Sequence, residues 1–219
     1  RGLVNGVPSM LLPVAMLAGQ FSQLGIHPTD LVVLVTGEKL YDGTLVGMAC
    51  ERLGHSRYAV LQGGMAGWLA AKRPLDTLLP AVTPSRYPAS PADNFTVDYR
   101  RVLNAMQDKN TVIIDVRPAD YYTGKKSDEA RAGHIPGAVN RPFSEDVVKT
   151  AQDVRFKPVS ELAGAYEKII PTRETPVIVH CRTGHQASQT FFVLKRLLGY
   201  KNVSYYDAGW TEWAARPEL

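Results

Sequence analysis

An internal repeat constrains the fold of this chain more than any other feature of its sequence. The sequence matches itself when one part is shifted by 145 residues against another, so that Leu53-Gly54 falls on Leu198-Gly199. In the same register, residues 12–21 fall on residues 157–166, with matching Pro, Val, Leu, Ala and Gly. Such a repeat predicts that the chain contains two copies of one structural unit.

The N-terminal residues Leu3 to Leu17 are mostly apolar, a composition that also occurs in signal peptides and membrane anchors. Two prolines, Pro8 and Pro13, interrupt the stretch, and it is too short to span a bilayer. Because the repeat pairs it with an internal segment, we interpret it as a buried helix of the first copy. We therefore expect no membrane association and a soluble protein, in either the cytoplasm or the periplasm.

Each copy of the repeat carries the same order of apolar patterns. Short β-branched runs predict buried parallel strands, and each is followed by a helical pattern that ends in Leu-Gly, with glycine as the C-terminal cap. A second apolar strand follows each helix. The expected strand, helix and strand are residues 31–35, 44–53 and 58–61 in the first copy, and 177–180, 187–198 and 203–206 in the second. This order predicts an α/β fold of two repeats, each a central parallel β-sheet flanked by helices.

The second copy begins with a front half that the first copy lacks. It comprises a helix near residues 97–107, a strand at 111–116 and a loop at 132–138, and the equivalent part of the first copy, about 50 residues, would precede residue 1. We expect the natural protein to extend upstream. Between the copies, residues 74–94 hold five of the fifteen prolines, which favours an extended linker. The predicted domains are an incomplete copy at 1–73, the linker at 74–94 and a complete copy at 95–219.

Composition excludes several classes of function. With 45% hydrophobic and 21% charged residues the chain is typical of a globular protein, and its net charge of +4 comes from scattered Lys and Arg, so no nucleic-acid-binding stripe is predicted. Its two cysteines, Cys50 and Cys181, are too few for a disulfide framework and lack the spacing of a zinc site. We predict no metal ion, nucleotide or organic cofactor. A small anionic substrate is compatible with the charge.

Cys181 stands at a chemically informative position, directly after the strand 177–180 and before a helix that begins near Ala187. A short loop in front of a helix N-terminus directs several backbone N–H groups at one point, and the helix dipole adds partial positive charge there. This arrangement predicts a lowered pKa for the thiol and stabilises an anionic persulfide or an incoming anionic donor. The alternative is a small buried hydrophobic residue at a strand end, the usual role of a single cysteine.

Four motifs together resemble the rhodanese family across nearly the whole chain. They are Asp115-Val-Arg117, Gly133-His-Ile-Pro-Gly-Ala138, Cys181-Arg-Thr-Gly-His-Gln-Ala187 and Gly209-Trp-Thr-Glu-Trp213. The sequence is most similar to bacterial two-domain thiosulfate sulfurtransferases, whose C-terminal domain is active and whose N-terminal domain is an inactive relative. The resemblance implies an enzyme whose cysteine takes a sulfane sulfur from thiosulfate, releases sulfite, and passes the sulfur to a thiophilic acceptor such as cyanide, a thiol or a protein.

The resemblance also assigns roles to individual residues. Cys181 is the persulfide carrier, and the six residues after it form the anion-binding loop: Arg182, Thr183, Gly184, His185, Gln186 and Ala187. Arg182 is expected to pair with the sulfonate end of the donor. Asp115 and Arg117 are expected to orient the loop through hydrogen bonds or a mutual ion pair. His134 is expected to hold backbone in place rather than act as a base.

Departures from related enzymes leave the sulfur donor open. Animal thiosulfate enzymes carry lysine where this chain has Thr183 and a further arginine where it has Tyr121, whereas mercaptopyruvate enzymes have Gly-Ser at positions 182 and 183. Thiosulfate is therefore the expected donor and 3-mercaptopyruvate the alternative. In the first copy the repeat places Thr36 on Cys181, and Glu38 and Asp42 would repel an anion, so this copy is expected to be catalytically silent.

Two further functions are compatible with parts of the pattern. A cysteine phosphatase on a related fold needs a Cys-x5-Arg loop, but position 187 is alanine and the loop is one residue too short for phosphate. A persulfide carrier without turnover, which receives sulfur from one protein and delivers it to another, would have the same sequence features. Turnover with small donors, compared with transfer from a partner protein, distinguishes the enzyme from the carrier.

The remaining candidates are assigned to packing or to the surface. The repeat aligns Cys50 with Lys195 inside a helix, which favours a structural thiol. Trp210 and Trp213 are expected to be packing residues. His27 and His55 are expected to lie on the surface.

Overall fold

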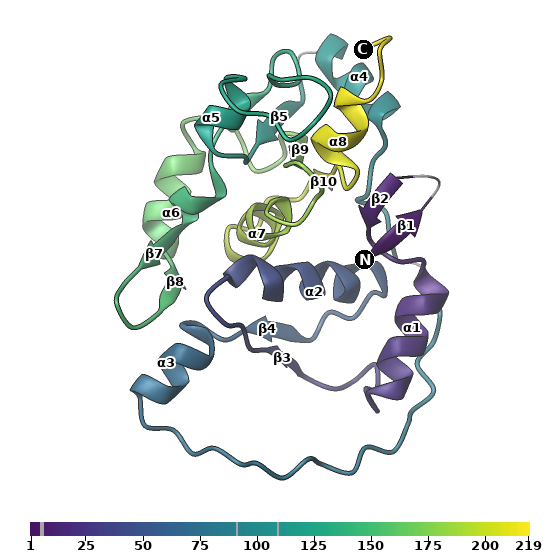
Figure 1. The fold of residues 1–219 in the computed structure, drawn as a ribbon, viewed down its shortest axis with the longest axis vertical. Helices are drawn as coiled ribbons and strands as arrows, with labels where there is room; N and C mark the ends of the chain where they lie inside the picture. The colour runs from purple at the N-terminus through teal and green to yellow at the C-terminus, as the bar shows by residue number, and fades with distance from the viewer. Residues whose placement is uncertain (5–6, 91, 109) are drawn as a thin grey trace. The chain divides into compact units, whose positions relative to one another are not determined.

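The computed structural model describes residues 1–4, 7–90, 92–108 and 110–219. The chain divides into two compact units. The Cys181 unit comprises Arg1–Met10, Phe95–Val148 and Phe156–Leu219, and the Thr36 unit comprises Leu11–Asn94 and Lys149–Arg155. Figure 1 draws the helices and strands of both units and labels most of them.

A four-stranded parallel sheet forms the centre of the Cys181 unit, with strand order β10-β9-β5-β6. The strands are β5 (Val112–Asp115), β6 (Val139–Asn140), β9 (Val177–His180) and β10 (Val203–Tyr205). All residues of β9 are buried, as its Val-Ile-Val run predicts for a strand covered on both faces. Because the strands are parallel, β5 and β9 end at the same edge of the sheet, where Asp115 pairs in register with His180.

Helices and a short strand pair complete the Cys181 unit (Figure 1). The helices are α4 (Tyr99–Asp108), α5 (Ala119–Tyr122), α6 (Val159–Tyr166), α7 (Ala187–Phe192) and α8 (Gly209–Ala214), with a 3-10 helix at Phe143–Asp146 and a π-helical segment at Val193–Leu197 that continues α7. β1 (Gly2–Val4) pairs antiparallel with β2 (Val7–Met10). Trp210 and Trp213 lie in the hydrophobic core of this unit, which confirms their predicted packing role.

The Thr36 unit contains a two-stranded parallel sheet and three helices among its described residues. β3 (Val32–Leu34) pairs with β4 (Tyr58–Val60), and the helices are α1 (Val14–Gln23), α2 (Leu40–Arg52) and α3 (Gly64–Ala70). Its core includes Phe21, Leu53 and the fully buried Cys50, in accord with a structural thiol. Elsewhere in the chain, β7 (Val147–Lys149) pairs with β8 (Val154–Phe156).

The two histidines assigned to the surface differ in their environment. His27 is exposed as predicted. The prediction for His55 is wrong, because its ring is buried in the core of the Thr36 unit. There Nδ1 lies 2.9 Å from the Tyr87 hydroxyl and Nε2 lies 3.1 Å from the Arg57 carbonyl oxygen, so both ring nitrogens have polar partners that offset the cost of burial.

Four pairs of elements in the two units begin 145 positions apart. The paired starts are Val14 and Val159 for α1 and α6, Val32 and Val177 for β3 and β9, Tyr58 and Val203 for β4 and β10, and Gly64 and Gly209 for α3 and α8. The two Leu-Gly helix ends also agree. Gly54 and Gly199 have φ of 68° and 71°, the left-handed conformation that closes a helix, so the predicted glycine caps are confirmed.

The equivalent strands β3 and β9 differ in burial. Val33 of β3 is 50% exposed, whereas Ile178, at the equivalent position of β9, is 1% exposed. β9 lies between β5 and β10, whereas β3 pairs only with β4 in the part of the chain that the structure describes. β3 is therefore an edge strand, and the prediction that residues 31–35 form a buried strand is wrong, because Leu31, Val33 and Val35 are exposed.

The first ten residues differ from the prediction. The sequence predicts one buried helix from Leu3 to Leu17, but this stretch contains β1 and β2, and α1 begins only at Val14. Pro13 is the N-cap of α1, and Pro8 has no backbone N–H to support a helix in front of it. Arg1–Met10 belongs to the Cys181 unit, whereas the predicted domain 1–73 assigns it to the first copy. That domain division stays a prediction, and the linker position 91 lies outside the described residues.

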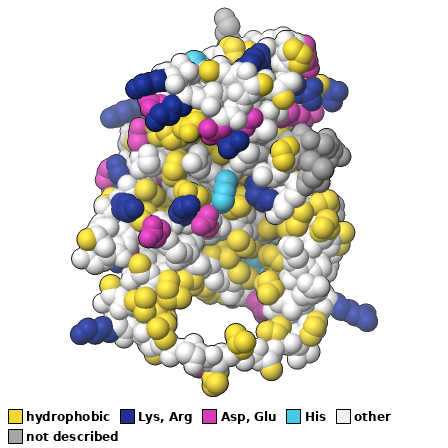
Figure 2. Space-filling model, viewed as in Figure 1, with side chains coloured by type: hydrophobic (Ala, Val, Ile, Leu, Met, Phe, Trp, Pro, Cys, Tyr) yellow, Lys and Arg dark blue, Asp and Glu magenta, His cyan; other side chains and the backbone are white. Residues whose placement is uncertain are grey.

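Two predictions concern contact with a membrane and with nucleic acid. Among the helices of the described residues, none is both long and apolar enough to cross a bilayer. On the face drawn in Figure 2, Lys and Arg side chains lie among Asp and Glu side chains rather than in a continuous stripe.

Candidate active site at Cys181

Cys181 lies immediately after β9, at the carboxyl edge of the sheet, and only 1% of its surface is exposed. Residues 182–186 form a loop that leads into α7. The backbone N–H groups of Thr183, Gln186 and Ala187 hydrogen-bond the sulfur. The structure therefore contains the main-chain donors around Cys181 that the sequence predicts, a setting that holds an anion without a cationic side chain.

The predicted lowering of the thiol pKa is wrong in this structure. Burial raises the pKa of Cys181 above its ordinary value of 9.0, and the three backbone N–H groups and Arg1, which act to lower it, only partly offset this effect. The sequence indicates the donors but not the depth of the sulfur. At neutral pH the thiol is therefore the dominant form of Cys181 in this conformation.

The rate at which iodoacetamide alkylates Cys181 should therefore still be rising with pH at pH 9.0, because only the thiolate reacts. The rates can be followed by mass spectrometry on the peptide that carries Cys181, with Cys50 resolved on a separate peptide. Free cysteine provides the reference profile. A plateau reached well below pH 9.0 would show that burial does not govern this thiol.

Two glycines determine the path of the Cys181 loop. Gly184 has φ of 79°, and a Cβ there would lie 2.4 Å from the Tyr205 hydroxyl, which donates to the Gly184 carbonyl oxygen at 2.7 Å. Gly209 has φ of 56°, and a Cβ there would lie 2.5 Å from the Cys181 carbonyl oxygen. That oxygen accepts a hydrogen bond from the N–H of Trp210 at 2.9 Å. At Gly209 the backbone of α8 thus packs directly against the backbone of the loop, whereas at Gly184 the loop backbone packs against the side chains of Tyr205 and Asp207, and both positions have the positive φ that favours glycine.

The side chain of Arg182 is half-exposed and faces acidic residues. Its Nε donates to Oε1 of Glu129 at 2.7 Å, and Nη1 lies 3.7 Å from Oδ2 of Asp128. The hydrogen bond to Glu129 raises the pKa of the guanidinium, which stays charged. An anionic donor that binds Arg182 would therefore compete with Glu129, which also accepts a hydrogen bond from the Thr211 hydroxyl. The side chains of the other polar loop residues, Thr183, His185 and Gln186, are partly buried.

Asp115 and Arg117 form a buried ion pair, one of the two arrangements expected for them. Arg117 donates through Nε and Nη2 to both carboxylate oxygens of Asp115, at distances of 2.6 to 3.0 Å. Nη2 also donates to the Gly133 carbonyl oxygen at 2.8 Å, and the guanidinium stacks 4.6 Å from the Trp210 ring centre. The pair is thereby connected to Cys181 through Trp210, whose N–H donates to the Cys181 carbonyl oxygen.

His180 lies between the ion pair and the cysteine. Its Nε2 is 3.9 Å from Oδ2 of Asp115, and its Nδ1 is 3.2 Å from the Cys181 carbonyl oxygen. Burial lowers the pKa of His180, which favours a neutral ring. Burial acts to raise the pKa of Asp115, but Arg117, through its hydrogen bonds and its charge, holds that pKa below its ordinary value, and His180 lowers it further only when its ring is protonated. Asp115 is therefore an ionised carboxylate in a buried, polar cluster.

The role predicted for His134 agrees with its contacts. Its Nδ1 lies 2.8 Å from the Tyr122 carbonyl oxygen, and its ring stacks on the Tyr122 ring with centroids 3.7 Å apart. These contacts hold the loop that contains Gly133 against α5. His134 thus contributes to backbone placement.

Three side chains beside the Cys181 loop were not predicted from the sequence: Arg1, Tyr205 and Asp207. The Arg1 guanidinium donates to the Thr183 carbonyl oxygen and pairs with Asp207, both at 2.5 Å. Asp207 follows the end of β10 by two residues, as Arg117 follows the end of β5. A polar residue just after a parallel strand could therefore have identified Asp207 as a candidate site residue. Arg1 has no comparable signal, because its partners Thr183 and Asp207 lie 182 and 206 residues away in the sequence, and a contact at such a separation leaves no local pattern.

Thr36, the counterpart of Cys181, has similar backbone surroundings but different side-chain chemistry. Its carbonyl oxygen accepts a hydrogen bond from the N–H of Met65 at 2.8 Å, and Gly64, with φ of 53°, packs against that oxygen. These contacts match those of Cys181 with Trp210 and Gly209. The Thr36 hydroxyl is buried without a hydrogen-bond partner among the described residues.

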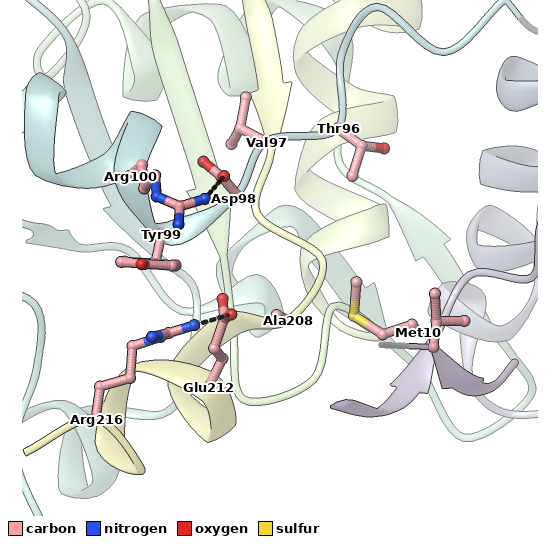
Figure 3. Close-up of a pocket in the computed structure, with 10 residues that line it drawn as sticks. Met10, Thr96, Val97, Asp98, Tyr99, Arg100, Ala208, Glu212 and Arg216 are labelled. Carbon is pink, nitrogen blue, oxygen red and sulfur yellow. Dashed lines mark hydrogen bonds and ion pairs between the residues drawn. The ribbon is translucent and has the colours of Figure 1, made fainter. Parts of the chain in front are cut away.

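A separate cavity of about 550 Å³ lies beside α4 and α8 in the Cys181 unit (Figure 3). Its lining residues are Val4, Met10, Thr96, Val97, Asp98, Tyr99, Arg100, Ala208, Glu212 and Arg216. The charged groups in it pair with one another, Arg216 with Glu212 at 3.1 Å and Arg100 with Asp98 at 3.7 Å. Since no residue of the Cys181 loop lines it, we do not assign it to that site. Among the described residues, no cluster of His, Cys, Asp and Glu has the arrangement of a metal site.

Comparison with known protein families and sequences supports a common origin. Residues 98–216 match the Rhodanese-like domain. The chain is 36% identical over 211 residues to a protein of Mycobacterium tuberculosis named putative thiosulfate sulfurtransferase, covering 90% of this chain and 74% of the relative. It is 30% identical over 212 residues to the thiosulfate sulfurtransferase of Azotobacter vinelandii, covering 96% and 76%. It is also 35% identical over 204 residues to the sulfur carrier protein TtuD of Thermus thermophilus, covering 87% and 70%.

Solved structures share the fold. The anaerobic ergothioneine biosynthesis enzyme of Chlorobium limicola, in complex with trimethyl histidine, superposes with a TM-score of 0.82 at 21% identity over 95% of this chain. A complex of the enzyme EanB with hercynine gives a TM-score of 0.84 at 20% identity over 99% of the chain. This chain spans about half the length of those proteins, 55% and 56%. At such identities the likeness establishes the fold.

Proposed function

The chain belongs to the rhodanese family, and on that premise we propose that it is a thiosulfate sulfurtransferase that carries sulfur as a persulfide on Cys181. The observation that carries the proposal is the set of three backbone N–H groups, from Thr183, Gln186 and Ala187, on the Cys181 sulfur. Such donors stabilise a negative charge on the sulfur and on a second sulfur bonded to it. The names of the relatives, which include thiosulfate sulfurtransferases and a sulfur carrier, support the same class of reaction.

The proposed reaction has two displacement steps. The Cys181 thiol first loses its proton to solvent, and the thiolate attacks the outer sulfur of thiosulfate. A bond forms between the two sulfurs, the sulfur–sulfur bond of thiosulfate breaks, and sulfite leaves with the electron pair. In the second step cyanide, a thiol or an acceptor protein attacks the outer sulfur of the persulfide, and the Cys181 thiolate leaves. The main-chain donors serve both steps because they stabilise the Cys181 thiolate, which attacks in the first step and leaves in the second, and the persulfide anion formed between the two steps.

The other residues of the site have supporting roles in this proposal. Arg182 pairs with the sulfonate oxygens of the donor and exchanges its contact with Glu129 for them. Gly184 and His185 shape the loop between the three donors. Asp115 and Arg117 keep the backbone of Trp210 in place behind Cys181. No metal ion or organic cofactor enters the reaction.

We further infer that the Thr36 unit is an incomplete and catalytically silent second copy of the repeat. The equal spacing of its elements and the matching backbone contacts of Thr36 and Cys181 support this inference. β9 pairs with both β5 and β10, whereas β3 pairs only with β4 among the described residues. The unpaired edge of β3 supports the inference that the part equivalent to β5 is not in this sequence. A threonine hydroxyl without a base is a poor sulfur carrier. The corresponding layout is the incomplete copy at 1–73, the linker at 74–94 and the catalytic domain at 95–219.

Two alternatives use the same cysteine. 3-Mercaptopyruvate would load Cys181 with release of pyruvate, and the similarity to a sulfur carrier protein favours transfer between protein partners. The near-complete burial of the sulfur also favours an acceptor protein that binds specifically at the site. Comparison of loading by thiosulfate, mercaptopyruvate and a persulfidated cysteine desulfurase distinguishes these donors.

Intact mass spectrometry before and after incubation with thiosulfate tests the proposal. We expect the protein to gain one sulfur atom and to lose it on addition of cyanide. Cys181→Ser should abolish the gain, and Cys50→Ser, which changes the other buried thiol, should retain it. If thiosulfate adds no sulfur to the folded protein, or if the gain survives in Cys181→Ser, the thiosulfate persulfide mechanism is refuted.

A further inference from the structure

The side chain of Arg1 connects three parts of the Cys181 unit. Nη2 donates to the Thr183 carbonyl oxygen and to Oδ1 of Asp207, and Nη1 donates to the Tyr205 hydroxyl at 3.3 Å. Nε donates to the carbonyl oxygen of Ser9 in β2. One guanidinium group therefore links the β1–β2 pair, the end of β10 and the backbone of the Cys181 loop. Arginine suits this role because its planar group presents several donors in fixed directions.

The carboxylate beside Arg1 is fully buried. Asp207 has no exposed surface, and the side chain of Arg1 is 14% exposed. A Cβ built on Gly184 would lie 2.6 Å from Oδ1 of Asp207 and 3.0 Å from Nη2 of Arg1, so this ion pair lies directly against the loop backbone. A buried carboxylate without a cation at this place would oppose negative charge on the nearby sulfur.

We propose that Arg1 is a positioning residue for sulfur transfer at Cys181. Its contact with the Thr183 carbonyl oxygen holds the loop in the conformation that directs the N–H groups at the sulfur. Its charge balances Asp207, so that the thiolate and the persulfide anion are favoured. The proposal rests on the proposed function and adds a residue outside the four sequence motifs. The direction in which Arg1 acts on the pKa of Cys181, which is downward, agrees with it.

The Thr36 unit differs at the positions equivalent to this site. The position equivalent to Asp207 is Gln62, which carries no charge, and the position equivalent to Tyr205 is Val60. The buried carboxylate therefore accompanies the cysteine and is replaced by a neutral side chain in the copy where threonine replaces the cysteine. We expect this difference if the ion pair stabilises an anionic sulfur. If the pair only stabilised the strand-loop-helix backbone that both units share, we would expect it in both units.

The test is the alkylation rate of Cys181 by iodoacetamide at a fixed pH below 9.0, where the rate follows the thiolate fraction. Arg1→Gln should slow alkylation about tenfold, because loss of the positive charge raises the pKa of Cys181 and lowers the thiolate fraction. Arg1→Lys, which keeps the charge, should slow it less. Arg100→Gln is the matched control, because its side chain is 74% exposed, and it should leave the rate unchanged. Single-turnover loading with thiosulfate should follow the same order.

The variant Arg1→Gln/Asp207→Asn separates charge balance from general damage to the fold. We expect it to regain most of the alkylation rate lost in Arg1→Gln, because it removes the carboxylate that Arg1 balances. Arg1→Gln within twofold of Arg100→Gln, or an equally slow double variant, would overturn the proposal. Alkylation needs no sulfur donor, so these outcomes remain decisive even if thiosulfate fails to load the unsubstituted protein, a result that would refute the proposed function alone.

Discussion

Replacement of Gly209 by alanine is expected to slow sulfur loading at Cys181 by about 100-fold or more. A Cβ at this position would lie 2.5 Å from the Cys181 carbonyl oxygen and 2.6 Å from that of Arg182. Both contacts are with backbone, which cannot rotate away as a side chain can. The loop must therefore shift, and its backbone N–H groups no longer point at the Cys181 sulfur. Alanine is also strained at a φ of 56°, so unfolding should become easier by about 2–4 kcal/mol.

The chain offers a matched control for this substitution. Gly64 has φ of 53°, and a Cβ there would lie 2.3 Å from the Thr36 carbonyl oxygen, the same clash in the unit without the cysteine. Gly64→Ala should lower stability to a similar degree while leaving the loading rate per folded molecule within about twofold. Loading is measured by mass spectrometry after brief exposure to thiosulfate, and stability by urea unfolding. Equal loss of loading in both variants would show that the effect of Gly209→Ala is general destabilisation.

Arg117→Met should destabilise the protein by about 3–5 kcal/mol, because it leaves Asp115 charged and buried without its main partner. Asp115 has no exposed surface, and of the two side chains that act to lower its pKa, Arg117 and His180, the variant keeps only His180. Asp115→Asn/Arg117→Met should recover part of the loss, since it removes the uncompensated charge. Arg100→Met, at an exposed and distant ion pair, should cost less than about 1 kcal/mol. Urea unfolding at about pH 7 gives all four values.

The stability lost in Arg117→Met should depend on pH. In the unsubstituted protein the pKa of Asp115 lies below its ordinary value of 3.8, so the contribution of the pair is fully present above that value and is lost as pH falls through the folded pKa. In Arg117→Met, burial should raise this pKa, and the variant gains relative stability as Asp115 takes up a proton. The difference between the two proteins should therefore narrow between about pH 7 and about pH 4. A difference that is constant over this range would show that Arg117 acts through packing rather than through charge.

The order and type of the main elements were predictable because they rest on local patterns. β-branched runs gave β3 and β9, and the Leu-Gly pairs gave helix ends at which Gly54 and Gly199 adopt positive φ. The first ten residues were not predictable in this way. Their apolar composition fits a helix or a strand equally well, and their pairing as β1 and β2 depends on contacts within the Cys181 unit rather than on period.

The candidate site was predictable in its backbone and less so in its electrostatics. A cysteine between a strand and a helix indicates the N–H donors, and these are present. The depth of the sulfur follows from packing by distant segments, so the direction of its pKa shift was predicted wrongly. Arg1 and Asp207 were missed for the same reason, since they meet only in the folded unit. The roles assigned to Arg182, Asp115 and Arg117 stay predictions until loading is measured in their variants.

The hydrogen bonds on the Cys181 sulfur come from the main chain, and this has a consequence for how the protein can diverge. Substitution of a side chain at position 183, 186 or 187 leaves its amide in place, and only proline removes the donor. Under the proposed function, the capacity to hold a sulfur anion depends on the main chain, whereas the choice of donor molecule depends on the side chains of the loop. Variation at Arg182, Thr183 and His185 can redirect the site to a new sulfur source while the carrier function persists, which makes this loop a suitable target for engineered donor specificity.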